Sequence, residues 1–115
     1  MKLFKHEAAK VVPGQGYLKK VLIDGSALGV PGSLIQEVEF RKGETVRQHH
    51  HRFQTEIFYA LDEALFVING QNVTMSPGDI VVCEPGDVHG NPVIPHDFRI
   101  LVLKVGYREN DIVWE

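Results

Sequence analysis

The chain has 115 residues, of which 43% are hydrophobic and 23% charged, and its formal net charge is −3. This length and composition predict one compact domain over residues 1–115, and the small negative charge gives no reason to expect nucleic acid or an anionic membrane as a partner. A single cysteine, Cys83, excludes an internal disulfide. With no signal-peptide pattern at the N-terminus and no run of about 20 apolar residues, a cytoplasmic location is expected.

Short β-rich runs between turn residues predict an all-β fold. In chain order the runs cover residues 17–23, 33–40, 45–51, 56–61, 65–69, 72–75, 80–83 and 98–105. Asn69 and Gly70 form the clearest hairpin turn, because both residues tolerate the positive φ of a type I′ turn. No segment keeps a 3.6-residue apolar period, so little helix is expected. This pattern favours a β-sandwich or barrel.

Three consecutive histidines end the third run. Side chains alternate on an extended strand, so His49 and His51 share one face and His50 lies on the other. The same alternation places Arg47 on the face of His49. Two imidazoles on one face can approach one metal ion, whereas the alternative for this run is a solvated polar edge.

Two residues elsewhere can complete a metal site. Glu56 begins the next run after a four-residue turn and is expected beside the histidine pair, on a neighbouring strand. His89 follows a Pro-Gly-Asp turn at 85–87. Imidazoles with one carboxylate suit Zn, Fe, Mn, Ni or Cu better than Mg or Ca, so a divalent transition metal is the predicted cofactor.

This spacing resembles the cupin superfamily, whose two motifs place glycines, histidines and a glutamate at fixed intervals. The matching positions are Gly43, His49, His51 and Glu56 in the first motif and Gly78, Gly86 and His89 in the second. Glu63, Glu84 and Val93 stand where those motifs have glycine, proline and asparagine. The spacing of Glu56 is similar to that in germins and oxalate-degrading cupins. The resemblance implies a cupin double-stranded β-helix, a jelly-roll barrel, with His49, His51, Glu56 and His89 as metal ligands.

The resemblance also limits the function. It implies a metal-binding small cupin that acts on a small organic acid, aromatic or sugar by oxidative chemistry or isomerisation. The alternatives are a non-catalytic module that binds or senses a small molecule and a structural protein with incidental histidines. The sequence identifies no catalytic residue. A homodimer is implied by the family alone, with residues 17–23 and 111–115 as interface segments.

Arg47 and Cys83 have two interpretations each, and two further histidines have one. Arg47 is either a contact for an anionic ligand or an exposed strand residue. Cys83 is either a nucleophile beside a histidine or, as the commoner case, a small apolar side chain in a buried strand. His6 and His96 lie among polar and turn residues and are expected at the surface.

Overall fold

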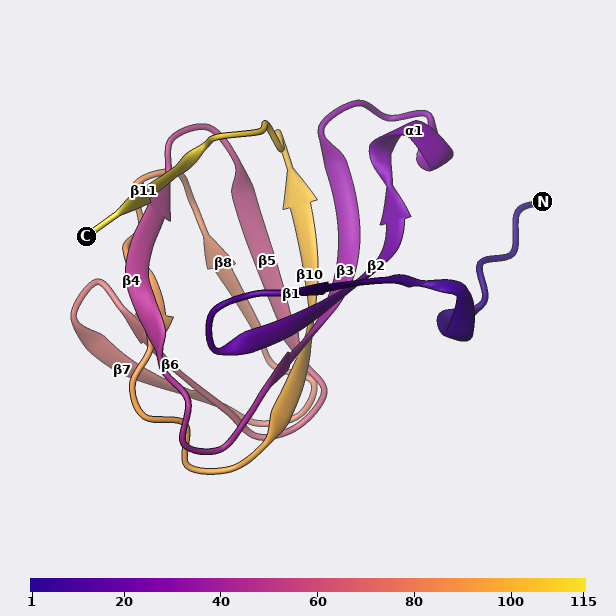
Figure 1. Cartoon of the computed structure of the whole chain (residues 1–115). Coiled ribbons are helices and arrows are strands. Elements are labelled where there is room, and N and C mark those ends of the chain that lie inside the picture. The colour runs from indigo at the N-terminus through magenta and orange to yellow at the C-terminus, as the bar shows by residue number, and fades with distance from the viewer.

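Two antiparallel sheets face each other and enclose the core (Figure 1). The computed structural model describes residues 1–115. The six-stranded sheet contains, in spatial order, β1 (Lys10–Pro13), β2 (Tyr17–Asp24), β3 (Ser33–Phe40), β10 (Phe98–Val105), β5 (Thr55–Ala60) and β8 (Ile80–Cys83). The five-stranded sheet contains β11 (Ile112–Trp114), β4 (Val46–His51), β9 (His89–Asn91), β6 (Ala64–Ile68) and β7 (Gln71–Met75). Two helical turns complete the chain, η1 (His6–Ala8) and α1 (Gly25–Leu28).

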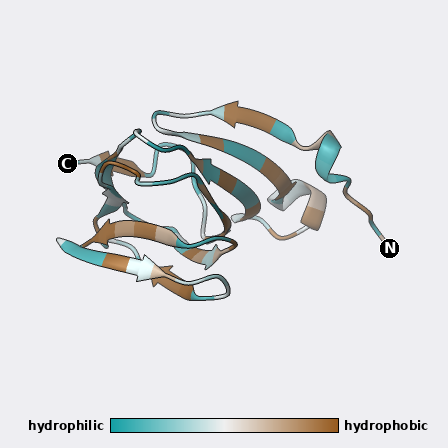
Figure 2. Cartoon of the chain, turned by 90° about the horizontal axis from the view of Figure 1, so that it is seen from below, coloured by the Kyte–Doolittle hydropathy of each residue, from teal (hydrophilic) through white to brown (hydrophobic).

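Alternation of residue type along the strands produces the two faces of each sheet. Hydrophobic and hydrophilic bands follow one another along the strands in Figure 2. In β10, for example, Phe98, Ile100 and Val102 are buried while Arg99 is exposed. The side chains that alternate inward therefore meet between the sheets.

Four phenylalanines lie at the centre of that core. The rings of Phe40 and Phe98 stack with centroids 4.8 Å apart, and those of Phe58 and Phe66 stack at 5.1 Å. Phe40 also packs edge-on against Phe66 at 5.6 Å, which links both pairs across the interior. The aromatic cluster also reaches a histidine, because the ring of Phe58 packs edge-on against that of His89 with centroids 5.7 Å apart.

The structure confirms the predicted hairpin. Asn69 and Gly70 connect β6 to β7 with φ values of 51° and 77°. The motif glycines Gly43, Gly78 and Gly86 also have positive φ, at 88°, 92° and 92°. A side chain at these positions would strain the backbone, so the spacing of glycines in the motifs reflects turn geometry.

Three short strands and two helical turns were not expected from the sequence. β1, β9 and β11 have only three or four residues each, too few to show a period. Asp24 is the N-cap of α1, and its side chain accepts a hydrogen bond from the Ala27 amide at 2.8 Å. No helix in the structure has the length and apolar character needed to cross a bilayer.

Candidate metal centre

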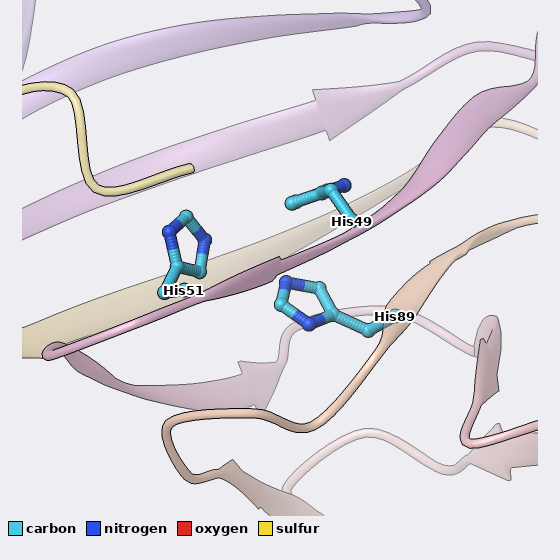
Figure 3. Close-up of side chains that lie close together, drawn as sticks. All are labelled: His49, His51 and His89. Carbon is cyan, nitrogen blue, oxygen red and sulfur yellow. The ribbon is translucent and has the colours of Figure 1, made fainter. Parts of the chain in front are cut away.

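Three histidine rings converge between the sheets (Figure 3). His49 and His51 belong to β4, and His89 belongs to the adjacent strand β9, directly opposite His49 in the register. Ring centroids are 4.4 Å apart for His49 and His89, 5.4 Å for His49 and His51, and 5.5 Å for His51 and His89. One nitrogen from each ring lies within 4.8 Å of the others, so the three histidines could hold a metal ion.

Backbone carbonyls determine which nitrogen is free in two of the rings. Nδ1 of His49 lies 2.8 Å from the carbonyl oxygen of Arg47, and Nδ1 of His89 lies 2.9 Å from that of Asp87. A carbonyl only accepts, so each Nδ1 must carry the proton and donate it. The lone pair of each ring is therefore on Nε2, in the tautomer that a metal ligand requires.

Buried nitrogens without hydrogen bonds identify the place that an ion would fill. Nδ1 and Nε2 of His51 and Nε2 of His89 are inaccessible to solvent and have no hydrogen-bond partner. Buried polar groups in folded proteins are normally paired. The fit of these residues to a divalent metal rests on this observation, because coordination would satisfy the unpaired nitrogens.

Glu56 approaches the histidines from the opposite sheet. Its Oε1 lies 2.9 Å from Nε2 of His51, without the alignment of a hydrogen bond, and its Oε2 lies 3.6 Å from Nε2 of His89. The prediction that Glu56 lies on a strand next to that of His49 and His51 is therefore wrong. β4 and β5 are in different sheets, and the carboxylate reaches across the interior. The four predicted ligand residues nevertheless lie together.

The charge states at this centre follow from burial and from the neighbouring groups. Burial lowers the pKa of His49 to about 4 and also lowers that of His89, so both rings are neutral at pH 7. Burial alone would raise the pKa of Glu56, but His51, Lys104 and His89 together outweigh it and lower the pKa to about 2. His49 and His89 thus present neutral imidazoles and Glu56 an ionised carboxylate, the forms that bind metals.

Arg47 does not share the face of the two histidines. The pairing of β4 with β9 shifts register between Val46 and His49, which reverses the alternation at that point. Val46 is buried and Arg47 is exposed, with Nε donating to the carbonyl of Glu115 at 2.9 Å and the guanidinium 5.8 Å from the Trp114 ring. The prediction that Arg47 shares the face of His49 was wrong, because an irregularity of one residue is invisible in the sequence, and of the two interpretations the exposed strand residue is confirmed.

The other single residues lie as expected. His50 points away from the centre, with Nδ1 2.9 Å from Oε1 of Glu115. Cys83 is buried, and burial raises the pKa of its thiol to about 12, which excludes a thiolate nucleophile at neutral pH. His6 and His96 are exposed and bond to Glu37 and to the Glu63 carbonyl.

The sequence interpretation missed the residues that surround Glu56. Gln54 is almost fully buried and its Nε2 donates to Oε1 of Glu56 at 2.6 Å. Nζ of Lys104 lies 3.8 Å from the same oxygen. The alternation along β10 could have predicted that Lys104 faces inward, because it continues the buried series of Phe98, Ile100 and Val102.

Asp111 fixes the turn between the two ligand strands. Its carboxylate accepts hydrogen bonds from the backbone amides of Arg52, Phe53 and Gln54, at 3.0 to 3.2 Å. These residues join β4, which ends at His51, to β5, which contains Glu56. One side chain from near the C-terminus therefore positions the link between a histidine and the carboxylate.

A partly solvent-open cavity adjoins the centre. His49, His51, Glu56 and His89 all contribute to its wall. The rest of the wall combines core residues such as Phe40 and Ile100 with polar residues that include Tyr17, Gln36 and Asn91. Apolar walls with a few polar groups are typical of small-molecule sites.

A family model described as a cupin domain matches residues 36–103, more than half of the chain. The chain is a cupin. The matched region contains all four of the residues predicted as ligands, and the two-sheet architecture confirms the predicted double-stranded β-helix.

Solved structures of other cupin-like proteins superpose on nearly the whole of this cupin. The polyketide cyclase RemF from Streptomyces resistomycificus is 22% identical, with a TM-score of 0.76 over 95% of this chain and 82% of RemF. KdgF from a Halomonas species is 20% identical, with a TM-score of 0.75 over 96% of this chain and 97% of its own. A predicted oxalate decarboxylase from Thermotoga maritima is 19% identical, with a TM-score of 0.77 over 90% and 98% of the two chains. At these identities the similarity shows the fold alone, and no curated protein matches the sequence.

Proposed function

We propose that this cupin binds a divalent transition metal through His49, His51, His89 and Glu56 and uses the ion to act on a small molecule in the adjoining cavity. The supporting observation is that the half-buried His49 and the buried His51 and His89 bring ligand atoms within 4.8 Å of one another. Nitrogens of His51 and His89 also have no hydrogen bond. The ionised carboxylate of Glu56 supplies the negative charge that favours a divalent cation.

The chain itself prepares the site in two ways. The carbonyls of Arg47 and Asp87 hold the rings of His49 and His89 in the tautomer with a free Nε2. The sheets bury His51, Glu56 and His89, which limits water at the centre. A bound divalent metal would supply Lewis-acid or redox chemistry there.

Metal content of the purified protein tests this proposal. Protein prepared without nickel affinity resin and then incubated separately with Zn²⁺, Mn²⁺ or Fe²⁺ is expected to hold close to one equivalent of at least one metal, measured by mass spectrometry of the element. His49→Ala and His89→Ala should each lose most of that metal. The loaded wild-type protein should also melt at a higher temperature than the chelated protein, because a ligand selective for the native state stabilises it.

His50→Ala is the matched control. It removes an imidazole from the same strand whose side chain bonds to Glu115 on the outside. The control should retain the metal and the increase in melting temperature. Equal metal loss in all three variants, or wild-type protein with less than about a tenth of an equivalent, would contradict the proposal.

Catalysis and simple binding make different predictions. Two structural neighbours are described as a polyketide cyclase and a predicted oxalate decarboxylase, which supports an enzymatic role for this cupin. Turnover of an organic acid, phenol or sugar that needs the added metal and is lost in His49→Ala would establish an enzyme. If a compound binds to the loaded protein and is recovered unchanged, the alternative of a binding or sensing module holds.

A further inference from the structure

Two lysines on the cavity wall are not ligands of the proposed metal centre. Lys19 of β2 and Lys104 of β10 both line the cavity, on the six-stranded sheet. Together with Glu56 they are the only lysine, arginine or acidic side chains in that wall. Two ammonium groups therefore face a single carboxylate in this wall, although the whole chain has a net charge of −3.

Glu56 does not form an ion pair with both lysines. Nζ of Lys104 lies 3.8 Å from Oε1 of Glu56, longer than a hydrogen bond, and the same oxygen already accepts from Gln54 at 2.6 Å. Lys19 has no carboxylate within 4.0 Å, and its Nζ lies 5.4 Å from the Tyr17 ring. An ammonium group offers three donors, so the pair has donors available for an anion.

The location of the lysines makes this excess charge costly without a ligand. Lys104 is only 8% exposed and Lys19 is half-buried. A partly buried charge that lacks a partner is unfavourable, whereas an anion bound between two ammonium groups would offset that cost. A divalent metal at the centre would add further positive charge to the same wall.

We propose that Lys19 and Lys104 bind the carboxylate of a small organic acid whose apolar part contacts Phe40 and Ile100. This inference rests on the proposed function, because it assigns a substrate class to the same cavity. The two oxygens of a carboxylate offer one acceptor to each lysine, and the core residues in the wall favour an apolar body.

Three probes with the same ring test the assignment: benzoate, benzamide and phenyl phosphate. Titration calorimetry with the metal-free and the metal-loaded protein should give at least about tenfold tighter binding of benzoate than of benzamide in both forms. Lys19→Gln and Lys104→Gln should each weaken benzoate binding about tenfold, as expected for loss of a charge-assisted contact, and leave benzamide binding unchanged. Lys104→Arg should recover most of the affinity that Lys104→Gln loses.

Lys20→Gln is the matched control, because Lys20 is next to Lys19 on β2 but lies opposite Glu37 of β3 and does not line the cavity. Its benzoate affinity should equal that of the wild type. Equal binding of benzoate and benzamide, tighter binding of phenyl phosphate, or full benzoate affinity in Lys19→Gln would overturn the proposal. Full affinity in that variant would mean that the carboxylate binds elsewhere, such as at the metal.

Metal content of every sample separates the two proposals. If the wild type binds no metal yet discriminates benzoate from benzamide through the lysines, the metal centre fails and the anion site stands. If the metal binds as expected and the lysine variants do not change benzoate affinity, the anion site fails alone. Circular dichroism of each variant identifies a folding defect, and Lys19→Gln, at a half-buried position, tests the proposal even if Lys104→Gln does not fold.

Discussion

The rings of His49 and His89 are oriented by the same kind of local hydrogen bond. Each ring bonds through Nδ1 to the carbonyl of the residue two positions earlier, on two strands that pair directly. His51 lacks such a bond, so its ring orientation depends on packing and on Glu56. Two of the three imidazoles are therefore fixed by their own backbone, and the third depends on its surroundings.

Gln54 gives a prediction at this scale. Its amide donates to Oε1 of Glu56 at 2.6 Å from inside the core. Because groups that orient a ligand contribute strongly to metal affinity, Gln54→Ala should weaken metal binding by roughly 10- to 100-fold without loss of fold. Competition with a chromophoric chelator measures this affinity. Gln71→Ala, an exposed glutamine of β7, should have no effect, and equal affinity in the two variants would contradict the role of Gln54.

Single residues were predicted well where a period or a motif applied and poorly elsewhere. The alternation His49, His50, His51 correctly separates inward from outward rings, because the strand is regular there. It fails at Arg47, where the register shift between Val46 and His49 intervenes. Gln54 was missed because it lies in a turn, whose side chains have no periodic pattern to indicate their direction.

At the scale of elements, the segment before β11 stabilises the connection between β4 and β5. Asp111 is 4% exposed and accepts from three successive amides of that connection. Burial opposes ionisation of Asp111, but the amides of Gln54, Phe53 and Arg52 outweigh it and lower its pKa. The C-terminal strand thus contributes to the site although it supplies no predicted ligand.

Replacing this carboxylate should destabilise the protein. Asp111→Asn leaves amide donors of the connection with a weaker, single acceptor, at a cost of about 1–3 kcal/mol in the free energy of unfolding. Urea denaturation measures this cost. Asp97→Asn is a suitable control, because Asp97 accepts one amide hydrogen bond, from Lys42, at an exposed turn. If Asp111→Asn loses no more unfolding free energy than Asp97→Asn, the Asp111 carboxylate does not stabilise the connection between β4 and β5.

The same residue predicts how stability depends on pH. The pKa of Asp111 is lower in the folded than in the unfolded chain, where it is about 3.9, so its contribution is present above that value and disappears as the pH falls through the folded pKa. The difference in melting temperature between the wild type and Asp111→Asn should therefore be constant from pH 6 to 8 and shrink below about pH 4. A constant difference down to pH 2 would contradict this assignment.

Strands of five or more residues were all predicted from the sequence, whereas of the four shorter ones only β8 was. Runs such as 33–40 and 98–105 alternate over eight positions, which is enough to define two faces. β9 is only His89–Asn91, and its pairing with β4 depends on contacts far apart in the chain. The neighbourhood of His49 and His89 was therefore accessible through the family motif and not through local periodicity.

At the scale of the whole molecule, the outer face of the six-stranded sheet has an apolar area at its β8 edge. Tyr59 lies opposite Ile80 and Ile57 lies opposite Val82 in the register of β5 and β8. Ile80 and Val82 are 59% and 50% exposed, respectively. The homodimer implied by the family stays a prediction, as do residues 17–23 and 111–115 as its interface, and this apolar face is a further surface that association would cover.

A charge on that face tests the dimer. Val82→Asp should shift the protein from dimer to monomer at micromolar concentration, because association would bury an unpaired carboxylate. Sedimentation velocity measures the change. Val93→Asp, at an exposed position outside the strands, should leave the distribution unaltered. A monomeric wild type would contradict the prediction directly.

The fold was predictable as a whole because several levels of the sequence agree. Strand length, turn residues and two motifs all indicate the same barrel, and the family match over residues 36–103 confirms it. The charge inside the cavity was not predictable, since it depends on which of Lys19 and Lys20 faces inward. Both choices fit an alternating strand, and only the pairing of β2 with β3 distinguishes them.

The donor groups come from both layers: the imidazoles from one sheet and the carboxylate from the other. An ion bound by all four side chains would connect the two sheets directly. Separation of the sheets would remove Glu56 from the three histidines, so the affinity for the ion should fall when the barrel opens. The fraction of protein that retains the metal would then report how much of the barrel has both sheets packed together.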